Sequence, residues 1–482
     1  MKVLLIYPSE MSVYKGTRFE FKQSQECLPP FALAVLAGAL RRGGHEVRAV
    51  DLQVETDPEA ALRGAVSSWR PEMVGISFKT PFFDAAREIA ARVRRLAPEV
   101  PIIGGGVHAT NYPRQCLEET EMDVIVVGEG DHALVRLADG TPPSELRDVA
   151  YRQDGEIVLH CTIDPQGRVR PEGTIHDLDQ LPYPDWSIFD SAKYPPVSRL
   201  FYNATPVGFL ETSRGCRARC IFCSNGVYGT RWRCKSAQRV VDEMEWMVGQ
   251  GFREIEIVDD SFTTDLGRAT AVCEEILRRK LEFSWCCRNG LRVNNVNQEF
   301  FTLARRAGLH LIGFGFETGN ETLLREIRKG TTLQQGRDAA RWAHRAGITV
   351  MGYFLMGLPG ETEQTLRETI DFACSLPIDF VKYNLAIPLP GTPLHEMWKD
   401  RMKVTRWSQY DFHFPPRELY EHPNLDWDTL EAYLRRGYRR FYLRPGYLLG
   451  QLRRLVRQGR LGISAKTALQ LLLGPREKHV SS

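Results

Sequence analysis

Cys216-Arg217-Ala218-Arg219-Cys220-Ile221-Phe222-Cys223 places three cysteines within eight residues, directly after a short apolar run at residues 208–212. Such a run indicates a buried β-strand, so the cysteines belong to the loop that follows a strand. Iron-sulfur clusters are held by cysteine thiolates, usually four, because each iron of a cubane takes one ligand. Three thiolates in one short loop therefore predict a four-iron, four-sulfur cluster with one iron left open to an outside ligand.

A structural zinc site completed by Cys234 is the alternative for these cysteines. Structural zinc prefers two Cys-x-x-Cys pairs, or cysteines together with histidines, at characteristic separations. The second pair is missing here, so the spacing favours the iron-sulfur cluster.

Strands and helices alternate downstream of the cysteine loop. The predicted strands are residues 208–212, 254–258, 281–285, 310–314, 349–353 and 380–384. Six parallel strands with intervening helices make a partial (β/α)6, TIM-like barrel, which we place at residues 206–405. The active site of such a barrel lies at the carboxyl ends of its strands, where the cysteine loop falls.

The first 140 residues show the same alternation. Their predicted strands are residues 3–7, 46–50, 73–77, 101–104 and 124–128. This pattern predicts an α/β, doubly wound, Rossmann-like domain, whose ligand lies beyond the carboxyl ends of the strands. Glycine and small polar residues follow three strands, and the candidate ligand-binding residues are Ser77, Thr80, Gly104, Gly105, Gly106, His108, Gly128, Glu129 and Gly130. Glycine lets the backbone approach a bulky ligand, and three such loops at one edge favour a ligand over simple turns.

Two regions flank the predicted barrel. Residues 141–205 form a linker with a hairpin at Asp154-Gly155, and residues 406–482 form a helical C-terminal region. Residues 435–460 hold nine arginines and no acid, interleaved with aromatic and aliphatic residues. They indicate either a helix with a solvated basic face or contact with a membrane surface or an anionic substrate. The aromatic residues of this region belong either to the core or to a pocket for a large apolar molecule; they are Trp407, Tyr410, Phe412, Phe414 and Tyr447.

Composition narrows the class of protein. The chain has 482 residues, enough for two or three domains, and its net charge of +3 is too small to indicate nucleic-acid binding. The N-terminal apolar run stops at Pro8, which is too early for a signal sequence or a spanning helix, so we expect a cytoplasmic protein. Eleven cysteines in a reducing compartment favour metal ligands and buried thiols over disulfides.

The Cys-x-x-x-Cys-x-x-Cys motif, with Phe222 before its last cysteine, resembles the radical S-adenosylmethionine superfamily. The resemblance implies that S-adenosylmethionine completes the cluster through its amino and carboxylate groups, next to Phe222. Glu317, within residues 313–319, matches the strand-four acid that holds the ribose. Residues 352–361, with Met356 and Gly357, resemble the strand-five motif near adenine.

Two further positions are candidates for binding S-adenosylmethionine. Arg288, after the third predicted strand, is a candidate for the cofactor carboxylate, although a lone arginine can equally be structural. Where many family members have Gly-Gly-Glu after strand two, this chain has Val258-Asp259-Asp260. Asp259 is thus a candidate for the cofactor, unless the two acids cap the following helix.

A doubly wound domain before such a barrel resembles the cobalamin-binding radical S-adenosylmethionine group, over residues 1–405. The chain contains no Asp-x-His-x-x-Gly, so the resemblance implies cobalamin without a protein histidine below cobalt. His108 is then a loop or ring-packing residue rather than a cobalt ligand.

Many members of this group are methyltransferases. The resemblance implies transfer of a methyl group from S-adenosylmethionine, through methylcobalamin, to an unactivated carbon or phosphorus of a biosynthetic intermediate. An oxidative cyclase or other oxidoreductase like the anaerobic Mg-protoporphyrin monomethyl ester cyclase has the same architecture. A methylthiotransferase would need a second cluster, on Cys27, Cys116 and Cys161, and an RNA-binding β-domain where this chain has an arginine-rich helix. A non-enzymatic, metal-stabilised binding module would require the barrel motifs to be accidental.

The expected partners follow from this chemistry. They are a small-molecule substrate, large and apolar if the C-terminal aromatic residues line a pocket, and an electron donor such as flavodoxin or ferredoxin. No nucleic acid is expected, and the arginine-rich region is the candidate for peripheral membrane contact.

Overall fold

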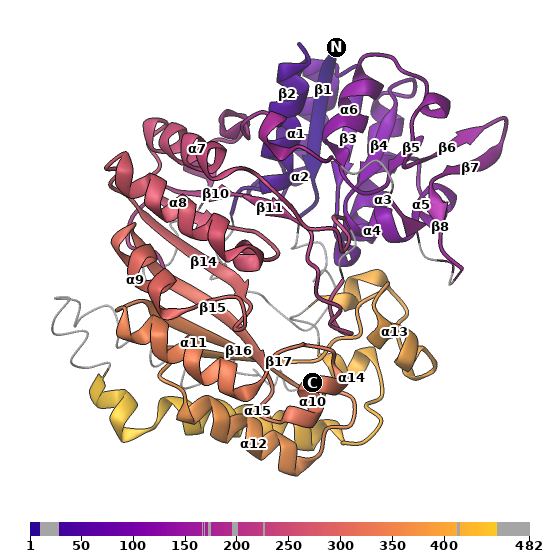
Figure 1. Cartoon of the computed structure of the whole chain (residues 1–482). Coiled ribbons are helices and arrows are strands. Elements are labelled where there is room, and N and C mark those ends of the chain that lie inside the picture. Colours follow the sequence, from indigo (N-terminus) through magenta and orange to yellow (C-terminus); the bar gives the residue numbers. More distant parts are fainter. Residues whose placement is uncertain are drawn as a thin grey trace.

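The computed structural model describes residues 1–9, 28–165, 167, 169–171, 175–194, 201–224, 227–411 and 415–450. Figure 1 shows an N-terminal α/β domain, drawn indigo to magenta, beside a second α/β domain whose outer helices run into the C-terminal helices. The α/β class, the doubly wound first domain, the partial barrel and the helical C-terminal region are as predicted. No helix in the described part of the chain combines the length and apolarity needed to cross a membrane.

A seven-stranded sheet forms the centre of the N-terminal domain. Its strands are β1 (Lys2–Tyr7), β2 (Glu46–Asp51), β3 (Met73–Ser77), β4 (Ile102–Gly105), β5 (Val124–Val126), β6 (Val149–Gln153) and β7 (Glu156–His160). The order is β2-β1-β3-β4-β5-β6-β7, parallel through β5 and antiparallel after it. Its first five strands have the flavodoxin-like order, in which the switch point lies between β1 and β3.

Helices cover both faces of this sheet. They are α1 (Phe31–Arg42), α2 (Pro58–Trp69), α3 (Phe83–Leu96), α4 (Val107–Asn111), α5 (Pro113–Glu119) and α6 (Gly130–Ala138). Strand β1 is buried along most of its length because helices lie on both sides, and its sequence is a continuous apolar run. The hairpin β6–β7, which the sequence pattern assigned to the linker, instead extends this sheet by pairing with β5. A two-stranded ribbon follows, β8 (Thr162–Ile163) with β9 (Val169–Arg170).

The second domain is a six-stranded parallel sheet in the order β10-β13-β14-β15-β16-β17. Its strands are β10 (Val207–Leu210), β13 (Glu254–Ile257), β14 (Ser284–Leu291), β15 (Leu309–Glu317), β16 (Thr349–Met356) and β17 (Phe380–Leu385). A short antiparallel pair, β11 (Ser213–Arg214) with β12 (Arg233–Cys234), frames the cysteine loop.

The helices of the second domain lie on the outer face of this sheet (Figure 1). They are α7 (Ala237–Gly249), α8 (Leu266–Arg278), α9 (Gln298–Arg306), α10 (Glu321–Glu326), α11 (Leu333–Arg345) and α12 (Glu363–Ser375). Several of these helices begin at a residue whose side chain accepts a backbone hydrogen bond, such as Ser236, Asp265 and Asn297. Side chains alternate along the strands, so Ile255 and Ile257 pack on the helices while Glu254 and Glu256 face the inside of the barrel.

The C-terminal region contains α13 (Pro393–Trp398), α14 (Pro416–Leu419) and α15 (Trp427–Tyr442). Strand β17 is an edge strand, and phenol groups occupy its outer edge. The hydroxyl of Tyr442 accepts from the Val381 amide at 3.1 Å and donates to the Val381 carbonyl at 3.0 Å. Tyr438 makes the same pair of bonds with Tyr383, at 3.1 and 3.0 Å. Helix α15 therefore satisfies backbone groups that a seventh strand would otherwise pair with.

The tail aromatics that the structure describes belong to packed regions. Tyr447 lies against the rings of Phe441 and Tyr442 and donates to the Asp379 carbonyl at 2.8 Å. Phe412 and Phe414 lie outside the described residues, as do the arginines after residue 450.

Candidate active site

The cysteine loop crosses the carboxyl end of the barrel, immediately after β10 and β11. Its backbone is fixed to the rest of the domain, because the Ile221 amide donates to the Ile327 carbonyl at 3.1 Å and the Cys216 amide donates to the Gly229 carbonyl at 3.3 Å. Gly215 has a φ of 82°, and a Cβ there would lie 2.5 Å from the Arg231 carbonyl oxygen. Only glycine fits at this position, directly before the first cysteine.

The three thiols of the loop influence one another. Surrounding protein, together with the Cys220 and Cys216 thiols, raises the pKa of Cys223 to about 12, although this side chain keeps a surface open to solvent. Burial also raises the pKa of Cys220, against the opposing effect of Lys329 and Arg292. Iron binding removes the thiol protons, and the neighbouring cations stabilise the resulting negative charge. The three cysteines therefore suit the cluster that the motif predicts.

Glu317 ends β15 beside the cysteine loop. Its side chain is buried, and its Oε1 accepts from Lys329 Nζ at 2.5 Å. Its φ of 66° is unusual for a residue with a side chain, and the strand register shifts between Gly315 and Glu317. A Cβ at Gly315 would lie 2.5 Å from Glu317 Oε1 and 2.8 Å from Lys329 Nζ, so Gly315 provides the space for this ion pair. Strained backbone of this kind concentrates at functional sites, which suits the predicted contact with ribose.

Arg288 does not follow the third strand but lies inside it, three residues before the end of β14. Its Nη2 donates to Glu256 Oε2 at 2.9 Å and also to the Tyr202 hydroxyl, so its guanidinium is held on the inner face of the barrel. Arg292, the first residue after β14, has Nη1 4.0 Å from Cys220 Sγ. Arg292 is thus better placed than Arg288 for the carboxylate of a cofactor bound at the cluster.

The two acids after β13 differ in their surroundings. Asp259 is buried and accepts from the Thr212 amide, the Thr212 hydroxyl and the Ser213 hydroxyl, all within 2.6 Å, so it fastens the strand that leads to the cysteine loop. Asp260 is exposed beside the loop and contributes to the raised pKa of Cys223. Although the Asp260 side chain reaches solvent, nearby protein atoms that displace water, together with the charges of Asp259 and Glu211, raise the pKa of Asp260 to about 6. Asp260 rather than Asp259 therefore faces the cluster site.

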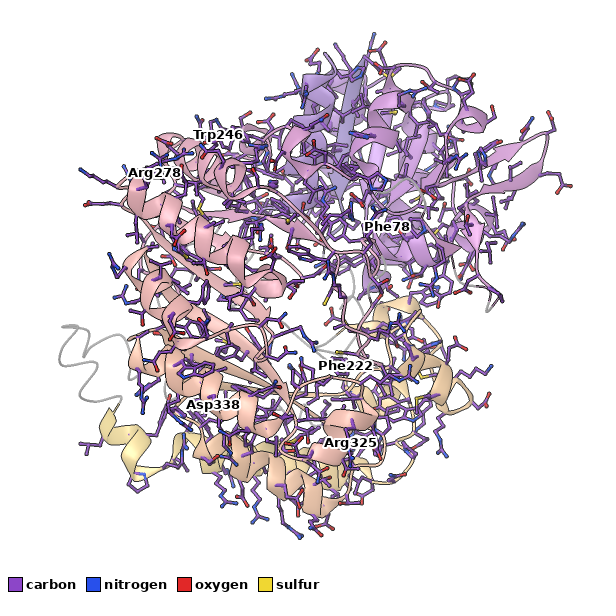
Figure 2. The ribbon with its side chains drawn as sticks, in the orientation of Figure 1. Phe78, Phe222, Trp246, Arg278, Arg325 and Asp338 are labelled. Atoms are coloured by element: carbon purple, nitrogen blue, oxygen red, sulfur yellow. The ribbon has the colours of Figure 1, made fainter. Side chains whose placement is uncertain are left out.

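The turn after β16 is built around a buried carboxylate. Gly357, with a φ of 83°, donates its amide to Glu361 Oε2, and the Leu358 amide donates to the same oxygen at 2.9 Å. Burial raises the pKa of Glu361 to about 7, against the effect of these amides. Met356 is buried in the core of the barrel domain, whereas Phe222, which lies within the cysteine loop, is partly exposed (Figure 2). Gly357 and Phe222 stay candidates for contact with S-adenosylmethionine.

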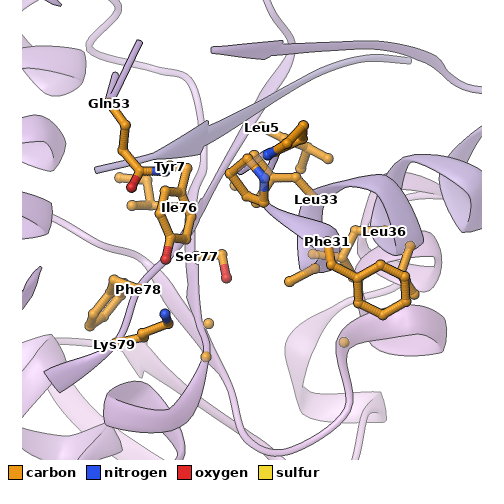
Figure 3. Close-up of a pocket in the computed structure, with 18 of the residues that line it drawn as sticks. Leu5, Tyr7, Phe31, Leu33, Leu36, Gln53, Ile76, Ser77, Phe78 and Lys79 are labelled. Atoms are coloured by element: carbon orange, nitrogen blue, oxygen red, sulfur yellow. The ribbon is translucent and has the colours of Figure 1, made fainter. Parts of the chain in front are cut away.

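A cavity of about 1370 Å³ opens at the carboxyl ends of the N-terminal strands. Figure 3 shows apolar side chains on its wall, among them Tyr7, Phe31 and Ile76, with Ser77 and Lys79 nearby. Seven of the predicted residues line it: Ser77, Gly104, Gly105, Gly106, Gly128, Glu129 and Gly130. The far wall comes from the barrel and includes Arg214 and Tyr228, neither of which is among the residues predicted to line the site.

Glycine keeps this cavity open at Gly105, where a Cβ would meet no atom within 4 Å. No histidine is among the described lining residues. A large, mostly apolar cavity with glycine at its floor and no histidine suits a corrin ring that has no protein ligand below cobalt.

Thr80 and His108 do not line the cavity. His108 is fully buried among the rings of Phe83 and Trp407, whose centroids lie 4.6 and 4.7 Å from its own. Its Nδ1 lies 3.4 Å from the Thr80 hydroxyl, and burial lowers its pKa to about 3. His108 belongs to an aromatic contact between the N-terminal domain and the C-terminal region, and Thr80 lies beside it. We call this contact the His108 cluster: Phe78, Phe83, His108, Tyr112 and Trp407.

Glu129 contacts the barrel rather than the interior of its own domain. One carboxylate oxygen lies 2.7 Å from Arg214 Nη1, and the other lies 2.7 Å from Arg233 Nη2. The corrin cavity and the cysteine loop therefore share a wall, because Arg214 lies two residues before Cys216.

The cysteines considered for a second cluster are not brought together in the described part of the chain. Cys116 is fully buried in α5, Cys161 follows β7, and Cys27 lies outside the described residues. The only set of three His, Cys, Asp or Glu side chains within ligand distance among the described residues is Glu254, Cys286 and His310, on the inner face of the barrel. There His310 Nε2 and Glu254 Oε1 already pair at 2.5 Å.

Comparison with known proteins agrees with this geometry. Residues 21–138 match the family model for the B12 binding domain, and residues 210–373 match that for the radical SAM superfamily. An uncharacterised methyltransferase of Pyrococcus horikoshii is 30% identical over 93% of this chain and 94% of its own length. The anaerobic magnesium-protoporphyrin IX monomethyl ester cyclase of Rubrivivax gelatinosus is 28% identical over 93% of this chain and 78% of its own length.

Among solved structures, the radical S-adenosylmethionine methyltransferase TsrM of Kitasatospora setae, with cobalamin and a [4Fe-4S] cluster bound, has the same fold. The TM-score is 0.71 at 22% identity, over 90% of each chain. Both family models, the full-length relative and the fit of the two sites lead to one conclusion. This chain belongs to the cobalamin-dependent radical S-adenosylmethionine enzymes, and its cofactors are a [4Fe-4S] cluster, S-adenosylmethionine and cobalamin.

Proposed function

We propose that the enzyme transfers a methyl group from S-adenosylmethionine, with cobalamin as the carrier, to an unactivated carbon or phosphorus of a small biosynthetic intermediate. The observation that supports this most directly is the shared wall: residues beside the cysteine loop line the corrin cavity. Radical generation and methyl delivery need their two cofactors close to one substrate, because positioning is the main contribution a protein makes to such chemistry.

The residues at the rim have distinct roles in this proposal. Cys216, Cys220 and Cys223 hold the cluster, which supplies the electron for cleavage of S-adenosylmethionine when both are bound. Arg292 faces the carboxylate of the cofactor, Glu317 faces its ribose hydroxyls, and Lys329 holds the Glu317 carboxylate in place. A carboxylate fixed by a buried lysine is pre-organised to accept hydrogen bonds from ribose.

Methyl transfer is favoured over oxidative cyclisation because methylating enzymes with different substrates align over most of this chain. They include the cytidylyl-2-hydroxyethylphosphonate methyltransferase of Streptomyces wedmorensis and the hopanoid C-3 methylase of Methylococcus capsulatus. An oxidative cyclase like that of Rubrivivax gelatinosus is the second candidate, since that relative aligns over as large a share of this chain as the Pyrococcus horikoshii methyltransferase does.

The proposed partners include a reducing protein such as flavodoxin or ferredoxin, because the cluster needs an electron. Peripheral membrane contact through the arginine-rich end is also part of the proposal. Within the described residues, Arg435, Arg436 and Arg439 of α15 line one surface hollow, and Leu443, Leu448 and Leu449 are exposed beyond it. Such a mixture of basic and apolar side chains suits the surface of an anionic membrane.

Anaerobic protein supplied with a corrinoid tests the cofactor roles. In Cys220→Ala, cleavage of S-adenosylmethionine should fall below detection because one cluster ligand is lost, while corrinoid binding stays within about twofold because the cavity is unchanged. Cys161→Ala, at a partly buried cysteine of the first domain, is the matched control and should keep both properties. Retained cleavage in Cys220→Ala would refute the cluster assignment.

Methyl-labelled S-adenosylmethionine separates the two candidate reactions. Incubated with cell extract from a strain lacking the gene, the enzyme should place label in one small-molecule product that depends on reductant. Oxidised product without label would support the cyclase, and label in RNA would support a methylthiotransferase.

A further inference from the structure

Five charged side chains from both domains meet at the wall between the corrin cavity and the cysteine loop. We call them the Arg214 cluster: Arg214, Arg233, Glu129, Asp131 and Glu211. Arg214 forms bonds in three directions. Its Nη1 donates to Glu129 at 2.7 Å, its Nη2 donates to Asp131 at 3.0 Å, and its Nε donates to Glu211 at 2.7 Å.

Burial makes these contacts depend on one another. The Arg214 side chain is 1% exposed and none of its partners exceeds 7%, so water cannot replace a lost contact. Although burial opposes it, Arg214 holds the pKa of Asp131 below its ordinary value, so this carboxylate is charged at neutral pH. Removing one member of a buried ion pair leaves the others without compensation, and the remaining groups must then move.

The positions of these residues in the chain give the cluster a role beyond packing. Glu129 and Asp131 lie on either side of Gly130, where α6 begins, and all three line the corrin cavity. Arg214 ends β11, two residues before Cys216, and its guanidinium lies over the Tyr228 ring, which also lines the cavity. A ligand that orders the 128–131 loop thus acts on the first ligand of the iron-sulfur cluster through one side chain.

We propose that Arg214 is a positioning residue that couples the two cofactor sites, so that cobalamin in its cavity tightens the binding of S-adenosylmethionine at the cluster. Cobalamin holds Glu129 and Asp131 in the arrangement that Arg214 requires. Arg214 in turn holds the start of the cysteine loop, and with it the open iron. By linkage the effect is reciprocal, so S-adenosylmethionine tightens cobalamin binding by the same factor.

The test measures binding, not turnover. Equilibrium dialysis of labelled S-adenosylmethionine against the full-length, cluster-loaded protein gives a dissociation constant with and without hydroxocobalamin. In the wild type the constant should fall at least about fivefold when cobalamin is present. In Arg214→Met the ratio of the dissociation constant without cobalamin to the constant with cobalamin should approach one. The change that S-adenosylmethionine causes in the electron paramagnetic resonance spectrum of the reduced cluster should likewise stop responding to cobalamin.

Two further variants keep the proposal open to refutation. Glu129→Gln keeps the shape of the side chain but replaces one of the two carboxylate oxygens that face Arg214 and Arg233 with an amide NH2, which cannot accept a hydrogen bond. It should lower the ratio, even if Arg214→Met fails to load its cluster. Arg279→Met is the matched control, because Arg279 contacts Asp242, Glu245 and Glu275 at 2.6 to 2.7 Å on the outer helices, away from both sites. It should keep the wild-type ratio.

A wild-type ratio of one would overturn the proposal, and so would an unchanged ratio in both Arg214→Met and Glu129→Gln. The inference rests on the two cofactors rather than on methyl transfer. Failure of methyl transfer would therefore leave this test readable, and a ratio of one in an active methyltransferase would refute the coupling alone.

Discussion

The N-terminal domain makes two contacts of opposite chemistry with the rest of the described chain. The Arg214 cluster joins it to the barrel with buried ion pairs, and the His108 cluster joins it to the C-terminal region with aromatic rings. Ion pairs need specific directions and distances, whereas rings tolerate small shifts while they keep most of their buried area. The Arg214 cluster, which includes the start of the cysteine loop, therefore constrains the geometry of its contact more tightly than the His108 cluster does.

The largest effect on stability is expected at the charged contact. Asp131→Asn removes one carboxylate from Arg214 and should lower the free energy of unfolding by about 3 kcal/mol, because the remaining buried charges lose compensation. Urea unfolding at pH 7.5 measures this. Asp242→Asn, at a half-exposed partner of Arg279, should change it by no more than about 0.5 kcal/mol. Equal effects of the two substitutions would remove the distinction between buried and surface charge networks here.

Trp407→Ala should lower the free energy of unfolding by about 2 kcal/mol, less than a fully buried tryptophan would, because the Trp407 side chain is only partly buried. Trp407→Phe should recover about half of the loss. Neither substitution should alter the cobalamin effect on S-adenosylmethionine binding, because none of the ring contacts that define the His108 cluster involves the cysteine loop. Loss of the cobalamin effect in Trp407→Ala would show that the His108 cluster constrains the geometry as tightly as the Arg214 cluster does.

Acid should weaken the aromatic contact first. His108 has a pKa of about 3 in the folded protein against 6.5 ordinarily, so the unfolded chain binds a proton that the folded one does not between these values. Stability from this residue is complete above pH 6.5 and falls as the pH falls, by about 2 kcal/mol at pH 5. The Asp131 contribution has the same sign but is lost only below its ordinary pKa of 3.8. His108→Phe should therefore flatten urea-unfolding stability between pH 7 and 5, and an unchanged slope would contradict the assignment.

The smallest effect on stability is expected inside the cavity, at Gly105, where an added Cβ would meet neither contact. Gly105→Leu should change the free energy of unfolding by less than about 0.5 kcal/mol, because no atom lies within 4 Å of the added Cβ. Corrinoid binding should nevertheless weaken at least about tenfold, since the side chain fills the ligand space. Gly64→Leu, on the exposed side of α2 with equally open surroundings, should leave corrinoid binding unchanged. Normal corrinoid affinity in Gly105→Leu would remove this loop from the site.

Sequence alone predicted both domains and the cysteine loop, because continuous apolar strands and closely spaced thiols are local signals. The errors in detail come from long-range contacts. Arg288 looked like a residue after a strand because polar residues usually end one, but Glu256 on the neighbouring strand makes a polar interior possible. Hairpin β6–β7 looked like a linker because its pairing with β5 leaves no mark in its own sequence.

Two residues beside the cysteine loop were missing from the sequence prediction for the same reason, because only long-range contacts bring them to the site. Arg292 follows β14 and Lys329 follows α10, so they are recognisable only once both lie beside Cys220. Asp259 and Asp260 are adjacent in sequence, yet one faces Thr212 and the other the cluster site, a difference set by the direction in which β13 ends.

The phenol groups along β17 cover part of the open edge of an incomplete barrel. An open sheet edge with unpaired amides and carbonyls can recruit a strand from another molecule and begin a growing assembly. Tyr438 and Tyr442 supply the backbone groups of Tyr383 and Val381 with a donor and an acceptor from a helix, and a helix cannot propagate a sheet. The barrel can therefore stay incomplete without its open edge becoming a seed for aggregation.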